Sequence, residues 1–239
     1  MSTSGITINQ LSGDQIINAA YRKLVVIGQG QTANAQQLLD GRQALNNLVA
    51  EFRTLGMSVW ARKTFPLPLV VGQQNYVFGV GQTTNTAYPL HMYQAILLQP
   101  PTFSVSQNVN ILSFMDFNLL PRDSVGTVVN MMYKPEINKG TVSVWPTPDA
   151  SMLPGTILSL TYQAPFEYFI AGVDTPDFPE EWNNALIYQL ALSLSDENGV
   201  PTQKQQWLEK QADKHIATAL SGGTEDASMY IQRDWSGNN

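Results

Sequence analysis

The spacing of apolar residues changes twice along this chain, and no other feature constrains the fold as strongly. Apolar side chains fall at helical spacing over residues 12–55, form short alternating runs broken by proline and glycine over 65–163, and return to helical spacing over 179–220. A helix repeats every 3.6 residues and a strand every 2, so one segment cannot satisfy both patterns. The sequence therefore predicts an α+β protein whose terminal helices enclose a β-rich middle.

Two helices are predicted in the N-terminal region. Ser12 and Gln15 have the spacing of a capping box, which predicts a helix that begins at Ser12 and ends near Gly28. A second helix is expected from about Thr32 to a C-cap at Gly56. Its apolar residues fall on one stripe and are Leu38, Leu45, Leu48, Phe52 and Leu55.

The middle of the chain is typical of strands. The β-rich runs lie at 63–67, 75–78, 93–98, 127–133, 140–145 and 156–163. Val142 and Val144 alternate with Thr141 and Ser143, which indicates a strand with one buried and one exposed face. Six such strands are enough for a small antiparallel sandwich or barrel.

Helical spacing resumes after a strong start signal. Asp177 has the position of a cap, Pro179 that of a first helical turn, and two glutamates follow at the positive end of the helix. The apolar stripe recurs every four residues at Trp182, Leu186, Leu190 and Leu194. Residues 198–201 break this helix, and a last one is expected to end at 222–223.

None of these helical stripes can be buried by its own helix, so the two helical regions are predicted to pack together. The domain hypothesis is a helical bundle of 12–57 and 179–221, with 58–178 inserted as a β-rich domain. Residues 222–239 are expected to form an extended C-terminal arm without helical spacing. Its apolar side chains are expected to dock on a partner and are Met229, Tyr230, Ile231 and Trp235.

The search for chemistry predicts no catalytic, cofactor-binding or metal-binding residues. The chain has no cysteine, and its two histidines, His91 and His215, stand at no ligand spacing. The glycines of 28–30 lack the lysine and the preceding strand of a phosphate loop, so an interhelical loop is expected there. The acidic pairs have the positions of helix caps or solvent-facing groups and are Glu180/Glu181, Asp196/Glu197 and Asp174/Asp177. The chain is therefore expected not to be an enzyme.

The polar residues are mostly uncharged amides, which mildly favours assembly. Only 13% of residues are charged, and the net charge is −6. Nine acidic and four basic residues fall within 179–239, so most of the negative charge belongs to the last quarter. No apolar run is long enough to cross a bilayer, and the N-terminus lacks the basic segment and apolar core of a signal peptide, so use in a cytoplasm without a membrane partner is expected.

Several stretches, in the same order and collinear over about 14–220, carry a resemblance to a known family. They lie at 18–24, 44–52, 69–76, 113–117, 140–148 and 179–192. In these stretches the chain resembles the head-to-tail adaptor (connector) proteins of short-tailed bacteriophages (podoviruses), of the tail tubular protein A or tail accessory factor type.

The resemblance implies a structural role in the virion neck. It implies a ring of twelve copies (a dodecamer) beneath the portal protein, assembled in the host cytoplasm, that carries the tail nozzle and fibres. Double-stranded DNA would pass through the ring during ejection without sequence-specific binding, which suits a wall that is acidic or uncharged. It also implies that the C-terminal arm reaches the portal or a neighbouring copy.

Two other functions remain open from the residues alone. A carbohydrate- or protein-binding β-module with helical flanks would account for the aromatic residues of the middle segment. A tail-associated hydrolase, which the residues favour less, would account for the acidic pairs. A glycan binder should be a monomer with an exposed aromatic surface, whereas a hydrolase should hold two converging carboxylates in a cleft.

Overall fold

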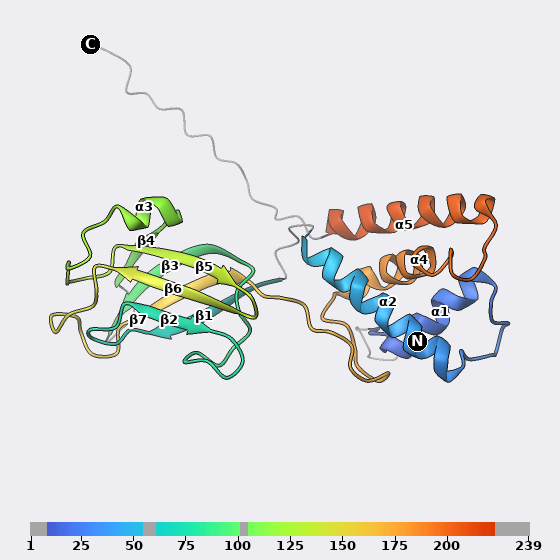
Figure 1. Cartoon of the computed structure of the whole chain (residues 1–239), viewed down its shortest axis with the longest axis horizontal. Coiled ribbons are helices and arrows are strands. Elements are labelled where there is room, and N and C mark those ends of the chain that lie inside the picture. The colour runs from blue at the N-terminus through green and yellow to red at the C-terminus, as the bar shows by residue number, and fades with distance from the viewer. Residues whose placement is uncertain (1–8, 55–60, 101–104, 223–239) are drawn as a thin grey trace, which may run out of the picture. The chain divides into compact units, whose positions relative to one another are not determined.

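The computed structural model describes residues 9–54, 61–100 and 105–222, which form a mixed α and β structure. These residues contain five α-helices and a seven-stranded sheet that curls into a half-barrel (Figure 1). Within them, no helix is both long and apolar enough to span a membrane. The predicted arm, with Met229, Tyr230, Ile231 and Trp235, lies outside the described residues.

The described residues divide into two compact units. The helical unit comprises 9–48 and 169–222, and the sheet unit comprises the remainder, including 49–54 at the end of the second helix. The domain boundaries predicted from the sequence lie at 57/58 and 178/179, several residues later at each junction. The boundary after the sheet unit lies at 168/169, before the predicted 178/179, because Phe169 is hydrogen-bonded to the second helix. The Asn46 side-chain amide donates to the Phe169 carbonyl at 3.0 Å and accepts from the Phe169 N–H at 2.9 Å.

The first helix begins as predicted and ends earlier. Ser12 caps it in a capping box, with the Gln15 side chain accepting from the Ser12 N–H at 2.9 Å. It ends at Leu24 and not near Gly28, because Val25 takes the left-handed conformation with φ 65° and donates to carbonyls of the last turn. The loop expected around 28–30 is confirmed, since the second helix begins at Ala35.

The elements of the helical unit follow the predicted order with one local difference. They are α1 (Gly13–Leu24), α2 (Ala35–Thr54), η2 (Glu180–Trp182), α4 (Asn183–Ser193) and α5 (Thr202–Gly222). The predicted Asp177 cap is wrong: Pro179 occupies the N-cap position with extended backbone and no capping side chain, and a 3₁₀ turn precedes α4. The break before α5 is confirmed, with Gly199 at φ 61°. Residue 222, assigned to the arm by the sequence, is the last residue of α5.

Most stripe residues are buried. Helix α4 packs against both α1 and α5 (Figure 1). Helices α1 and α2 approach closely at Gly41, where a Cβ atom would lie 2.6 Å from Ile17 Cγ2. Leu38 is only half-buried, and Leu55 lies outside the described residues. The other predicted stripe residues are fully buried: Leu45, Leu48, Phe52, Trp182, Leu186, Leu190 and Leu194.

The seven strands form one sheet that curls into a half-barrel, so the barrel predicted from the sequence is open, and the alternative prediction of a sandwich of two sheets is wrong. Its strands are β1 (Arg62–Pro68), β2 (Asn75–Phe78), β3 (His91–Gln99), β4 (Val105–Leu112), β5 (Asn130–Glu136), β6 (Lys139–Trp145) and β7 (Ile157–Gln163), in the order β1-β7-β3-β4-β5-β6-β2. All pairs are antiparallel except β4 with β5, which is parallel. Strand β4 escaped prediction because its sequence is rich in Ser, Gln and Asn.

Strand β4 is also where the sheet changes partner. Val105 to Val109 pair with β3, whereas Asn110 to Leu112 pair with β5. One continuous strand therefore holds the two halves of the sheet together. The core on the buried face includes Phe78, Leu97, Met131, Leu158 and Leu160.

The alternation of buried and exposed side chains predicted for β6 is confirmed at its valines and fails at Ser143. Val142 and Val144 are fully buried, but Ser143 is buried as well. Its hydroxyl donates to the Asn75 side-chain carbonyl at 2.6 Å, which satisfies the polar group on that face.

Val25 gives a test of the backbone geometry at the end of α1. A β-branched residue at φ 65° is strained, so Val25→Gly should raise the free energy of unfolding by about 0.5–1 kcal/mol in urea titrations. Val26→Gly is the control. Val26 has no positive φ, so this change should lower the free energy of unfolding by a similar amount. If both variants lowered the free energy of unfolding equally, the left-handed conformation of Val25 would be contradicted.

Candidate functional site

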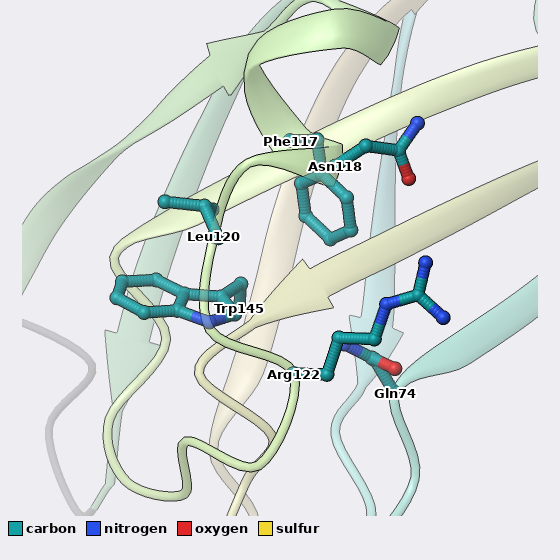
Figure 2. A pocket seen from close by; sticks show the side chains of 6 residues that line it. All are labelled: Gln74, Phe117, Asn118, Leu120, Arg122 and Trp145. Atoms are coloured by element: carbon teal, nitrogen blue, oxygen red, sulfur yellow. The ribbon is translucent and has the colours of Figure 1, made fainter.

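A pocket of about 240 Å³ lies beside α3 (Phe114–Asn118), the one helix that the sheet unit holds entirely within its described residues. Figure 2 shows Phe117 and Asn118 on the α3 side of this pocket, with Arg122 and Gln74 toward the opposite edge. Leu120 and Trp145 complete the lining. We call this the α3 pocket. Its charged lining residue is Arg122, and no carboxylate lines it.

Helix α3 is built by polar side chains and not by a buried stripe. None of its residues is buried. The Ser113 hydroxyl accepts from the Asp116 N–H at 3.2 Å and donates to the Asp116 carboxylate at 2.7 Å. The Asn118 amide donates to the Phe114 carbonyl at 2.9 Å. These local bonds support a five-residue helix that packing alone would not hold.

The segment after α3 is tied to the end of β6. The Trp145 indole N–H donates to the Pro121 carbonyl at 2.8 Å. Two residues later in the chain, the Thr147 N–H donates to the Ser124 carbonyl at 3.0 Å, and the Thr147 carbonyl accepts from the Gly126 N–H at 2.9 Å. The segment that follows α3 is therefore held to the end of β6 by hydrogen bonds at Trp145 and at Thr147.

Large apolar side chains are exposed on α3 and in the segment that follows it. Leu119 is 83% exposed, Met115 75%, Val125 66% and Phe114 56%. Met115 and Leu119 are four residues apart, so they project from the same side of the helical turn. We call these four residues the α3 platform. Covering such a side chain typically contributes about 1.5–3 kcal/mol, which makes the platform a candidate docking surface.

A second pocket, of about 200 Å³, lies in the helical unit between α2 and the end of α4. It is lined by Asp40, Gln43, Ala44, Asn47, Ser193, Leu194 and Glu197. Both carboxylates are exposed. Burial raises the pKa of the nearby Tyr21, and the charges of Asp40 and Glu197 raise it further. The pocket is thus lined by two solvated carboxylates, and the nearby Tyr21 stays protonated.

One member of each acidic pair singled out in the sequence accepts hydrogen bonds from the protein. Glu180 accepts the Asn9 N–H at 2.8 Å, and Asp196 accepts the Gln205 amide at 2.8 Å. Asp174 accepts the N–H groups of Ala171 and Ile170, which hold the pKa of that carboxyl below its usual value. In the described residues, no three His, Cys, Asp or Glu side chains gather closely enough to hold a metal ion.

The two histidines lie in separate aromatic contacts. His215 stacks on Tyr188 with ring centroids 4.9 Å apart. Burial lowers the pKa of His215, and the charges of Lys214 and Lys23 lower it further. His91 meets Tyr93 edge to face at 4.9 Å.

Sequence reasoning missed the α3 pocket and its platform. Seven of the nine predicted stripe residues are buried in the cores of the two units, and the arm residues lie outside the described part of the chain. A signal was present: residues 114–120 carry five apolar side chains in seven positions. A helix of little more than one turn cannot bury apolar groups on every side, so some of them had to remain exposed.

Comparison with known proteins adds no relative. No protein-family model matches the chain, and no curated protein matches it at a significant level.

Trp145→Phe tests whether the indole hydrogen bond holds the pocket wall. Loss of this bond should cost about 0.5–1.5 kcal/mol and speed amide hydrogen exchange at Gly126 and its neighbours, without exposing the sheet core. Trp207→Phe, in the helical unit, should leave exchange in 119–126 unchanged. If amide hydrogen exchange in 119–126 were the same in both variants, the hydrogen bond from Trp145 to Pro121 would not fix the wall of the α3 pocket.

Proposed function

We propose that this chain is a structural adaptor that forms a ring between the portal of a short-tailed bacteriophage and its tail nozzle and fibres. The ring of twelve copies extends the DNA channel and helps to retain packaged DNA. The observation that carries this proposal is the α3 platform, whose exposed apolar side chains adjoin in the chain the residues of the α3 pocket, and the pocket lining contains amides and a guanidinium but no carboxylate.

The division of the chain supports a two-part role. In this proposal the helices of both chain ends form a bundle that builds the ring, and the inserted sheet unit presents the α3 platform to tail proteins. Contacts of α4 with α1 and with α5 support the bundle. Adaptors join two different assemblies, so two separate compact units suit the task.

The C-terminal arm completes the proposed assembly. Met229, Tyr230, Ile231 and Trp235 are apolar anchors that would dock on the portal or on a neighbouring copy. Tyr230 and Trp235 are the principal anchors, because aromatic side chains dominate the energetics of most protein interfaces.

A glycan-binding module is the second candidate, and the α3 pocket favours it specifically. Trp145 and Phe117 offer aromatic faces, while Gln74, Asn118 and Arg122 offer the hydrogen-bonding groups that sugars need. In this alternative the pocket, and not the surrounding platform, would carry the function. A platform variant would then leave glycan binding intact.

Leu119→Asp tests the adaptor proposal. The side chain is 83% exposed, so the change should alter stability by less than about 0.5 kcal/mol. It should nevertheless reduce the yield of tailed, infectious particles when the variant chain replaces the normal one in phage assembly, because a charge would replace a docking contact. The readout is electron microscopy of the particles, which should show heads without nozzle or fibres.

Ile137→Asp is the matched control for this test. Ile137 is 90% exposed in the hairpin between β5 and β6, and it belongs neither to the lining of the α3 pocket nor to the α3 platform. It should give tailed particles in normal yield. Normal tails in both variants would mean that the α3 platform does not carry tail proteins.

A further inference from the structure

Helix α5 is fully buried along one narrow stripe only. Of its 21 residues, the buried ones are Leu208, Ala212 and Ala219, and the helix packs along α4 (Figure 1). At 3.6 residues per turn these three side chains point in nearly the same direction. The two flanks of α5 on either side of this stripe are therefore surfaces of the helical unit.

One flank gathers lysines around aromatic rings. Lys204 Nζ lies 4.1 Å from the centre of the Trp207 ring, and Trp207 meets Tyr188 at 6.0 Å. Lys23 Nζ of α1 lies 4.9 Å from the centre of the Tyr188 ring, and the charge of Lys214 acts on the adjoining His215. We call Lys23, Lys204, Trp207 and Lys214 the basic flank.

The basic flank has no carboxylate of its own. Within the described part of the chain, none of its three lysines forms an ion pair. Trp207 is 41% exposed, so its ring, with Lys204 against it, is open to a partner. Three lysines beside the linked rings of Trp207, Tyr188 and His215 concentrate positive charge on a chain of net charge −6, and this charge is complementary to an acidic surface.

The opposite flank of α5 is acidic. Glu209 and Asp213 are one turn apart and both are exposed. With about 100° per residue, this pair lies roughly 100° to one side of the buried stripe, and the basic flank residues of α5 lie roughly as far to the other side. Like charges four residues apart repel, so Glu209 and Asp213 favour a cationic partner.

One copy cannot bring its two flanks together, because the helix itself separates them. A second copy can place its acidic flank on the basic flank of the first, and its own basic flank then remains open for a third. Such head-to-tail contacts close into rings when the rotation between copies allows it. The charge pattern of α5 thus has the form of a heterologous interface.

We propose that adjacent copies of this chain dock through α5, with Glu209 and Asp213 of one copy on Lys23, Lys204 and Lys214 of the next and with Trp207 at the centre of the contact. This inference rests on the proposed ring and names the surface that builds it. The exposed indole supplies apolar contact, and the charges set register and orientation.

Charge reversal on each flank tests the interface. The variants Glu209→Lys/Asp213→Lys and Lys204→Glu/Lys214→Glu should each self-associate roughly tenfold or more weakly than the normal chain in sedimentation velocity. An equimolar mixture of the two variants should recover association, because each then offers the flank that the other needs. The fourfold variant, with both flanks reversed, should recover it alone.

The control changes the charge equally in the sheet unit. Asp123→Lys/Glu167→Lys alters two exposed carboxylates there and should associate as the normal chain does. Carbodiimide coupling of lysines to carboxylates, in mixtures of ¹⁵N-labelled and unlabelled chain, should give mixed-isotope peptides that join Lys204 or Lys214 to Glu209 or Asp213.

The outcomes separate this interface from the adaptor proposal. Normal association of both reversal variants, or absence of self-association and of mixed-isotope cross-links at any soluble concentration, would overturn the interface. Loss of duplex DNA binding in Lys204→Glu/Lys214→Glu, with association intact, would overturn it too and make the basic flank a phosphate-binding surface. Rings that depend on the flanks but do not bind a portal would support the interface and count against the adaptor.

Discussion

The helical unit depends on the burial of α4 between α1 and α5. Leu186 and Leu190 of α4 and Ile16 and Ile17 of α1 have no exposed surface, although more than 150 residues separate them in the chain. Apolar stripes on short helices are stable only when another helix covers them. Helices that precede and follow the sheet unit in the chain must therefore pack together, and the sheet unit is connected to them as an insertion.

This constraint explains why the order of elements could be predicted and the details of the sheet could not. Helical periodicity, the Ser12 capping box and the break before α5 depend on neighbouring residues, so the sequence alone was sufficient for them. The curl of the sheet and the parallel pairing of β4 with β5 depend on contacts between distant strands. Strand β4 in particular has a polar sequence that does not indicate a strand, and its extended conformation is stabilised by pairing with β3 and β5.

The candidate site was hidden for a related reason. The same kind of side chain is buried at Leu45 and exposed at Leu119, and only the length of the helix and the presence of a neighbour distinguish the two cases. Likewise, Glu209 and Asp213 can be assigned to one flank of α5, and Lys204 and Lys214 to the other, only once Leu208, Ala212 and Ala219 fix which side faces α4. Function in this account comes from surfaces, which periodicity alone does not locate.

The central claim is that this chain is a ring adaptor on a phage portal, and electron microscopy of the purified full chain mixed with the portal of its own phage tests it most directly. The account predicts a ring of twelve copies bound to one end of the portal and coaxial with its channel. Portal particles without added density, or a ring of six copies, would contradict it.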